Sequence, residues 1–218
     1  MPDHKKSLIV LEALLVIFVA MIVYRWFSLN QAIKSNDEYL SGASDQSAEQ
    51  NLTAPVLLTS DPARGYNQAE TVVVTFEDFT CAYCAQMSNT LSELVNRYPK
   101  KIRVVWKDFV GSLEQTGLRS AVAARCAQSQ GKFWEYHDFL FANQTSLSDA
   151  FYKQIAGDLG LDEARFNSCF DNQETLPLVQ QSFNEGLALG VDATPYVFIN
   201  AERFSGLVSY EQLEQLIQ

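Results

Sequence analysis

Basic residues are scarce in this chain of 218 residues, which has 16 Lys and Arg against 26 Asp and Glu. The formal net charge is −10 and the sequence pI is about 4.6. A nucleic-acid partner requires clustered positive charge, so this balance argues against one. The sequence also has no internal repeats. We interpret the acidity as a contribution to solubility.

Potential metal ligands are also few, with four Cys and two His. A zinc site built on the closely spaced Cys81 and Cys84 needs two further ligands. The remaining candidates are Cys126, Cys169, His4 and His137. His137 falls in an aromatic segment, where a core or surface histidine is the simpler interpretation. The sequence therefore predicts no metal site and no bound cofactor.

Long hydrophobic runs are confined to residues 8–27, which we interpret as a transmembrane signal anchor. A cleaved signal peptide is the alternative, but the residues after this run offer no small-x-small cleavage site. Tyr24 and Trp26 suit a membrane interface. Lys5 and Lys6 favour a cytoplasmic location for residues 1–7, which directs the rest of the chain outside the cytoplasmic membrane.

Residues 28–54 are polar and predict a flexible linker, so folded sequence begins near Pro55. Strands are expected at Pro55–Thr59, Thr71–Phe76 and Ile102–Trp106, with a turn at Asp61–Gly65. A helix begins at Cys81 and ends before Pro99, because apolar residues recur there at helical spacing.

Five helical segments without an intervening strand follow the third strand. They are expected at Leu113–Gln130, Lys132–Asn143, Asp149–Leu159, Glu163–Phe170 and Glu174–Leu189, the last with an apolar stripe of Leu176, Val179, Phe183 and Leu187. Strand character returns at Tyr196–Asn200 and Arg203–Ser205, and a capping box of Ser209 and Gln212 starts a final helix. This order predicts an α/β fold with a mixed sheet, formed by residues 55–112 and 191–218 around a helical insertion at 113–190.

The motif Cys81-Ala82-Tyr83-Cys84 carries the chemistry, because two thiols at a helix start can close and reopen a small disulfide ring. Cys81 lies at the helix N-terminus, where unpaired N–H groups favour thiolate and solvent has access. Cys84 shares the apolar stripe and should be buried. We therefore expect Cys81 to be the attacked sulfur and Cys84 the resolving one. A zinc half-site or a structural bridge are the alternatives.

A second element is Thr194-Pro195, directly before an apolar strand. Proline at a strand start has a simple explanation, since no ladder hydrogen bond is lost there. Few X–Pro bonds are cis, so the sequence alone gives little reason to expect one here.

Taken together, these features resemble the DsbA-like branch of the thioredoxin superfamily, and its membrane-anchored bacterial members in particular. The similar stretches are Phe79–Cys84, Ala127–Asp138 and Thr194–Asn200. The resemblance covers about Pro55 to Gln218 and implies a thioredoxin-like fold. It also implies that Pro195 is cis beside the Cys81–Cys84 pair, where the Thr194 backbone pairs with an extended substrate peptide.

The sequence departs from this family pattern in several places. Many relatives carry a buried acid six residues before the first cysteine, where this chain has Thr75. Glu77 and Asp78 fall at other strand positions and are open to interpretation as surface charge. Ala82 replaces a common proline, and Ala82 and Tyr83 supply no positive charge to stabilise thiolate. We therefore expect a milder oxidant than the strongest relatives.

Cys126 and Cys169 lie on apolar faces of the helical insertion and should be buried. Two free core thiols are one interpretation. In an oxidising compartment a mutual disulfide is the other, and we favour this structural bridge slightly.

These observations lead to one main hypothesis, a membrane-anchored thiol:disulfide oxidoreductase that forms disulfides in exported cysteine-containing proteins. A quinone-linked membrane oxidase would reoxidise it. The alternatives are an isomerase or reductase kept reduced by a membrane electron donor, a chaperone that uses the peptide groove, and thiolate delivery of copper or zinc. We expect a monomer, with its catalytic domain on the periplasmic side of the cytoplasmic membrane.

Overall fold

A computed structural model describes residues 21, 23–25, 52–111, 115–200 and 202–217. The chain divides into two units, residues 1–50 and 51–218, and the fold reported below belongs to the second. The anchor expected at residues 8–27 and the linker expected at 28–54 lie almost entirely outside the described residues. Within the described ranges, no helix is both long enough and apolar enough to cross a membrane.

A five-stranded mixed sheet lies at the centre of the second unit, in the order β1-β3-β2-β4-β5. Its strands are β1 (Ala63–Gly65), β2 (Thr71–Glu77), β3 (Ile102–Asp108), β4 (Tyr196–Ile199) and β5 (Glu202–Ser205). β2 and β3 are parallel, and the other pairs are antiparallel. β2 and β3 are buried along nearly their whole length, which explains their continuous apolar and β-branched sequences.

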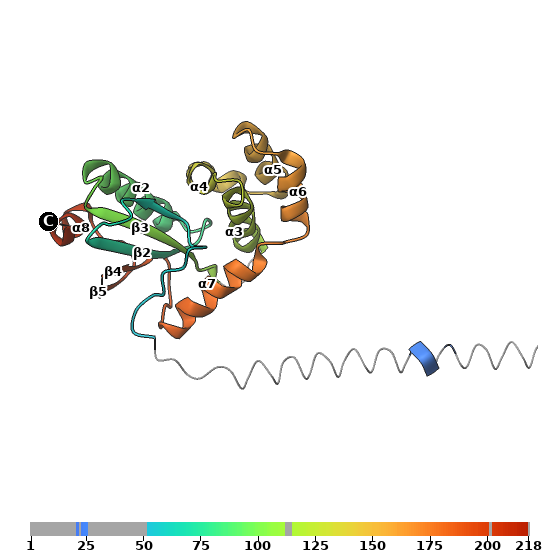
Figure 1. The fold of residues 1–218 in the computed structure, drawn as a ribbon, viewed down its shortest axis with the longest axis horizontal. Helices are drawn as coiled ribbons and strands as arrows, with labels where there is room; N and C mark the ends of the chain where they lie inside the picture. The colour runs from blue at the N-terminus through green and yellow to red at the C-terminus, as the bar shows by residue number, and fades with distance from the viewer. Residues whose placement is uncertain (1–20, 22, 26–51, 112–114, 201, 218) are drawn as a thin grey trace, which may run out of the picture. The chain divides into compact units, whose positions relative to one another are not determined.

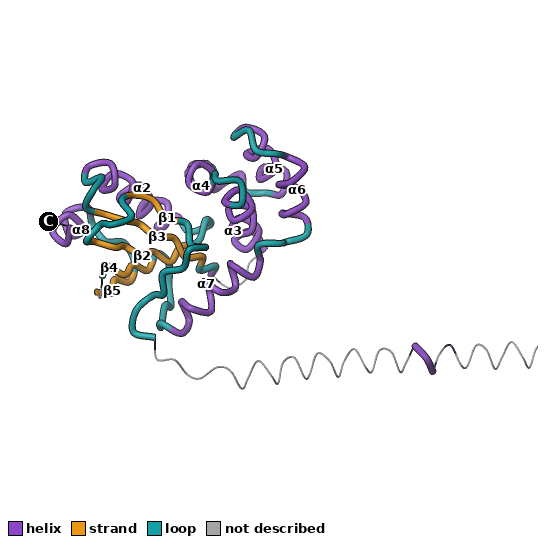
Figure 2. Tube along the Cα trace, viewed as in Figure 1, coloured by secondary structure: helices purple, strands orange, loops and turns teal. Residues whose placement is uncertain are grey.

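Helices cover both faces of this sheet (Figures 1 and 2). One face packs against α2 (Ala82–Arg97) and α8 (Tyr210–Ile217) through a buried cluster that includes Val73, Val104, Met87, Leu91 and Leu213. The other face packs beside α7 (Leu176–Ala188), where Gly186 lies against Phe109. A Cβ atom at Gly186 would lie 2.5 Å from that ring, so the close approach requires glycine.

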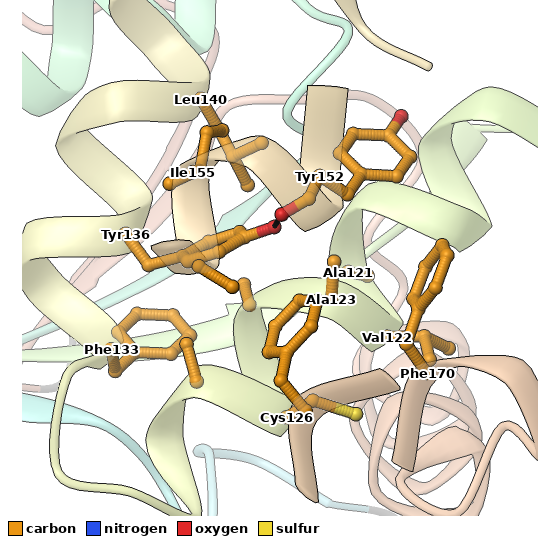
Figure 3. Packing of buried hydrophobic residues seen from close by; sticks show 14 of the residues in the cluster. Ala121, Val122, Ala123, Cys126, Phe133, Tyr136, Leu140, Tyr152, Ile155 and Phe170 are labelled. Atoms are coloured by element: carbon orange, nitrogen blue, oxygen red, sulfur yellow. Dashed lines mark hydrogen bonds between the residues drawn. The ribbon is translucent and has the colours of Figure 1, made fainter. Parts of the chain in front are cut away.

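The helical insertion has its own core, which Figure 3 shows in part. It comprises α3 (Gln115–Gln128), α4 (Phe133–Ala142), the 3₁₀ turn η2 (Gln144–Ser146), α5 (Asp149–Asp158) and α6 (Glu163–Asp171). Aromatic rings fill most of this core, and the Tyr136 hydroxyl donates a 2.8 Å hydrogen bond to the Tyr152 carbonyl. The buried Tyr136 hydroxyl is thus satisfied inside the apolar core.

Buried ion pairs connect the insertion and α7 to the sheet. Arg125 of α3 lies 2.7 Å from Asp108 at the end of β3, and both side chains are almost fully buried. Lys107 of β3 lies 2.8 Å from Asp61 and 2.7 Å from Glu185 of α7. Loss of one partner would leave an uncompensated charge in a dry environment, so these pairs hold the elements in one arrangement.

Most predicted elements are confirmed within a few residues, but the first strand is wrong. Pro55–Thr59 form no strand, because side chains take their backbone partners: Val56 N–H binds Glu185 and Leu58 N–H binds Asp61. The first strand is instead β1, which lies inside the predicted turn and pairs with β3.

The apolar stripe expected on the segment Glu174–Leu189, which forms α7, is also partly wrong. Leu187 is 54% exposed, and the buried face of α7 is formed by Val179, Ser182 and Gly186. The close packing of Gly186 on Phe109 fixes the rotation of the helix and turns Leu187 outward. Val179 is buried as expected and Leu176 and Phe183 are partly buried, so Leu187 is the one misplaced residue of the stripe. Gly186 and Ser182 carry no apolar signal, which is why the periodicity did not place them on the buried face.

Cys126 and Cys169 form a disulfide between α3 and α6, with their Cα atoms 5.9 Å apart. Both cysteines are buried in the core of the insertion. The bridge favoured over two free thiols is therefore present, and it joins residues separated by 43 positions.

Replacement of both Cys126 and Cys169 by Ala should lower the free energy of unfolding by about 4 kcal/mol, because the loop of 43 residues is no longer closed in the unfolded chain. Denaturant unfolding followed by circular dichroism measures this difference. A control with Cys81→Ala and Cys84→Ala removes two cysteines without opening the insertion. Equal stability of the two double variants would contradict a structural role for the bridge.

Candidate active site

The site lies where β2 ends and α2 begins, and Cys81 is the N-cap residue of that helix. Its backbone is extended, with φ −82° and ψ 118°, and its sulfur accepts a hydrogen bond from the Cys84 N–H at 3.3 Å. This is the position where helical N–H groups lack intrahelical partners. The sulfur of Cys81 thus takes the place of the oxygen that usually caps a helix.

The two thiols differ in exposure as the spacing predicts. Cys81 is partly exposed, whereas Cys84 is fully buried on the inner face of α2 beside Met87. Both are free thiols in this structure. Tyr83, between them, is 61% exposed, and neither it nor Ala82 brings a charge to the sulfur.

The Thr194–Pro195 peptide bond is cis, and Pro195 is buried. The register of β2 with β4 pairs Phe76 with Tyr196, so this bond lies beside the end of β2. The thiol loop, residues Asp78–Cys81, starts from that end. The Thr194 carbonyl oxygen is 3.4 Å from the Cys81 sulfur. The geometry implied by the family resemblance is therefore present.

Hydrogen bonds lower the pKa of Cys81 from 9.0 to about 6. The largest contribution is a hydrogen bond from the Cys84 side chain, and burial acts in the opposite direction. The Thr194 side chain and the backbone N–H groups of Cys84 and Tyr83 add to the lowering.

Burial raises the pKa of Cys84 well above its ordinary value, and the hydrogen bond to Cys81 and the charge of Glu77 act in the same direction. A backbone hydrogen bond from Asp78 opposes the increase. The pair thus combines an accessible thiolate with a protonated, shielded thiol. An attacking sulfur and a resolving sulfur require this division.

Glu77 and Asp78 are both buried, so the interpretation as surface charge is wrong. Burial raises the pKa of Glu77 to about 8, although a 2.5 Å hydrogen bond from the Thr75 hydroxyl lowers it. The second carboxyl oxygen of Glu77 is buried without a partner. Thr75 has no acidic proton to exchange. Its hydroxyl instead orients Glu77, which lies two positions further along the same strand face and can exchange a proton.

Asp78 has a different task, because its carboxyl organises the loop before Cys81. One oxygen accepts from the Thr80 N–H and hydroxyl at 2.8 Å, and the other accepts from the Gly111 N–H at 2.9 Å. The Asp78 carbonyl accepts from the Cys81 N–H at 3.0 Å. Asp78 therefore links the thiol loop to the segment that follows β3.

The family model described as Thioredoxin matches residues 58–218. The chain belongs to the thioredoxin family. Among solved structures, a thioredoxin-like oxidoreductase from Silicibacter pomeroyi DSS-3 is 25% identical, with a TM-score of 0.67, over 73% of this chain and 91% of that one.

Two more solved structures share the fold of this thioredoxin-family domain. The thiol-disulfide exchange protein alpha-DsbA2 from Wolbachia pipientis is 24% identical, with a TM-score of 0.66, over 73% of this chain and 86% of that one. BdbD from Bacillus subtilis is 16% identical, with a TM-score of 0.68, over 74% and 92%. The likeness supports a DsbA-type fold with a helical insertion.

A curated relative, the Na(+)/H(+) antiporter NhaA 3 of Salinispora tropica, is 32% identical over 168 residues. The match covers 77% of this chain but only 26% of that protein, so the chain spans about a quarter of the relative's length. Only the thioredoxin-family part is shared.

His137 lies in the aromatic part of this thioredoxin-family domain, next to the thiol loop. Its ring makes edge contacts with Phe79, Trp106 and Phe141, and burial lowers its pKa to about 4. It is therefore a neutral core residue. In the part of the chain that the structure describes, no three His, Cys, Asp or Glu side chains gather as a metal site would require, and His4 lies outside that part.

Gln144 is a contact residue that sequence reasoning missed. Its side-chain amide donates to the Phe79 and Cys81 carbonyl oxygens at 2.8 and 2.9 Å. Gln144 lies 65 positions from Phe79 and 63 positions from Cys81 in the chain, so no local sequence pattern could indicate these contacts.

In the reduced protein, the rate at which iodoacetamide alkylates Cys81 should rise with pH through a midpoint near 6, because only the thiolate reacts. Mass spectrometry of quenched samples follows the reaction. The Cys81→Ser variant should react slowly at every pH in the folded state, since Cys84 is buried and the other two cysteines are bridged. A midpoint close to 9 for the parent protein would contradict the site described.

The reduced Glu77→Gln variant should become more stable relative to the parent protein as pH rises, because the parent loses stability when the buried Glu77 carboxyl ionises. The folded pKa of Glu77, about 8, exceeds its ordinary 4.5, so its favourable contribution is complete below pH 4.5 and is lost as pH rises through 8. Between these values the stability difference should grow by about 1.4 kcal/mol per pH unit.

Denaturant unfolding of the parent protein and the variant from pH 5 to 8 measures this difference. Glu93→Gln, on the exposed side of α2, is the matched control and should give no comparable slope. Parallel pH profiles for the parent and Glu77→Gln would show that Glu77 is not a buried acid with a raised pKa.

Proposed function

We propose that this chain is a membrane-anchored thiol:disulfide oxidoreductase that forms disulfides in exported proteins. The observation that carries the proposal is the position of the Cys81 sulfur, between the Cys84 N–H and the carbonyl before cis-Pro195. A sulfur held there is accessible, is a good leaving group as thiolate, and has its partner thiol directly behind it.

The reaction starts from the oxidised Cys81–Cys84 pair. A substrate thiolate attacks the Cys81 sulfur, the bond between Cys81 and Cys84 breaks, and Cys84 leaves with the electron pair. Cys84 takes up a proton, and Glu77, a buried acid whose pKa is raised to about 8 and whose charge acts on Cys84, is the proposed source. A second substrate thiolate then attacks the substrate sulfur of the mixed disulfide, and Cys81 leaves as thiolate. The substrate gains a disulfide, and the pair has accepted two electrons.

Substrate binding is assigned to the backbone beside Pro195. Thr194 is partly exposed, and its carbonyl lies next to the reacting sulfur. An extended peptide that pairs with the backbone of Thr194, just before β4, would bring its own cysteine to Cys81. Such backbone pairing accepts many sequences, as an enzyme that acts on diverse exported chains requires.

The direction of electron flow separates the proposed oxidase from an isomerase or reductase. The lowered pKa of Cys81 stabilises the reduced form, which favours electron transfer from substrate to protein. A quinone-linked membrane oxidase is the proposed acceptor, and a membrane electron donor would take its place in the alternative. A measured reduction potential, with the redox state of the pair in cells, distinguishes the two.

Anchoring by residues 8–27, with the catalytic domain on the periplasmic side, is part of the proposal and depends on the sequence. The antiporter activity named for the curated relatives is not transferred to this chain, which spans about a quarter of their length. Disulfide formation requires an oxidising compartment, and the Cys126–Cys169 bridge supports the same location.

The Cys84→Ala variant should accumulate mixed disulfides with substrate proteins through Cys81, because the resolving sulfur is missing. Cells that express it, treated with acid to quench thiol exchange, should show adducts on non-reducing gels that vanish on reduction. The double variant Cys81→Ala, Cys84→Ala is the control and should show none. Absence of adducts with Cys84→Ala would refute the proposed function.

A further inference from the structure

Gln144 joins the helical insertion to the thiol loop through two hydrogen bonds from one amide nitrogen. The residue starts η2, directly after α4, and is half-buried. Its Nε2 lies 2.8 Å from the Phe79 carbonyl oxygen and 2.9 Å from that of Cys81. These carbonyl groups flank Thr80, so a single side chain spans the last turn of the loop before α2.

The rest of the loop is held from other directions. Asp78 fixes its start through Gly111, and the Phe79 ring packs on Trp106 and Phe141, with ring centroids 4.7 and 5.1 Å apart. These side-chain contacts hold the loop as far as Phe79 and Thr80 and do not include Cys81. Among the described residues, Gln144 is the side chain that hydrogen-bonds the backbone of Cys81 from outside the loop and its helix.

The Cys81 carbonyl matters because its orientation fixes the ψ angle of the N-cap residue. That angle sets where the sulfur points relative to the helix start. The same carbonyl accepts from Cys84 N–H at 3.1 Å and from Ala85 N–H at 3.3 Å, so it also defines the first turn of α2. The amide of Gln144 is a third donor to this carbonyl, and it comes from outside the helix.

We propose that Gln144 is a positioning residue for the redox pair, through which the helical insertion holds Cys81 in the geometry that makes its sulfur reactive. The inference rests on the proposed function and adds a role for the insertion in it. The insertion is then part of the catalytic apparatus as well as a neighbouring structural unit.

The chemistry of the side chain makes this role specific. A glutamine amide carries two N–H donors, which suit two carbonyl acceptors. An ionised glutamate of the same shape has no donor and places negative charge against both carbonyls. A lysine ammonium again supplies donors, from a side chain of comparable reach. Glu and Lys also change the charge beside Cys81, so Gln144→Met, which retains the side-chain volume without donors or charge, separates the loss of donors from the loss of volume.

The test uses the full-length reduced protein and the pH midpoint of Cys81 alkylation by iodoacetamide. Gln144→Ala should raise the midpoint by about half a pH unit or more, because the N-cap sulfur is less well oriented toward its donors. Gln144→Glu should raise it further. Gln144→Lys should keep it at or below the parent value.

Gln130→Ala is the matched control. Gln130 also binds the backbone of a distant residue with both ends of its amide, at the N–H and carbonyl of Asp162, but it lies elsewhere in the insertion. This variant should leave the midpoint unchanged. Circular dichroism and thermal unfolding of each variant show that the fold is intact.

Unchanged midpoints in Gln144→Ala and Gln144→Glu, or an equal increase in Gln130→Ala, would overturn the inference. Should Gln144→Ala not fold, Gln144→Met, which retains side-chain volume without donors or charge, decides it: a raised midpoint is expected, and an unchanged one overturns the inference. The alkylation reaction requires no substrate protein. A failed search for mixed disulfides would therefore count against the proposed function alone, and a flat pH midpoint against the role of Gln144 alone.

Discussion

The hydrogen bonds that Cys84 donates to the Cys81 sulfur, from its side chain and from its backbone N–H at the start of α2, are the interaction on which the site depends. A helix start offers N–H groups without intrahelical partners, and a negative charge is stabilised there. The chain places sulfur at that point and buries the second thiol one turn later. The difference in acidity between two chemically identical side chains follows from this placement, with the cis peptide bond before Pro195 completing the surroundings.

Elements that are distant in sequence hold this arrangement from several sides. β4 brings Thr194 to the sulfur, the carboxyl of Asp78 ties the loop to Gly111, and Gln144 reaches it from the insertion. The Arg125–Asp108 pair in turn fixes the insertion to the end of β3. A buried charge pair contributes more to a defined geometry than to stability, and a site that exchanges covalent bonds needs such definition.

Local sequence patterns predicted the elements and the two thiol roles, because helical periodicity decides which side of α2 each cysteine occupies. The cis state of Pro195 followed from the family resemblance and had little support from local chemistry. The burial of Glu77 could not be predicted, since it depends on what covers the end of β2. The failure of the expected first strand could not be predicted either, since the partner of the Val56 N–H is Glu185, 129 positions away. Gln144 escaped prediction for the same reason.

Burial of the Cys126–Cys169 bridge protects the structural disulfide from the exchange reaction that takes place at Cys81. In a protein that catalyses thiol–disulfide exchange, any accessible structural disulfide can be attacked by the protein's own reactive thiolate or by substrate thiolates. Here the Cys126–Cys169 bridge is buried among aromatic side chains, whereas Cys81 of the other pair is partly exposed. Reductants and substrate thiols consequently reach Cys81 and not the bridge, which stays oxidised through repeated turnovers.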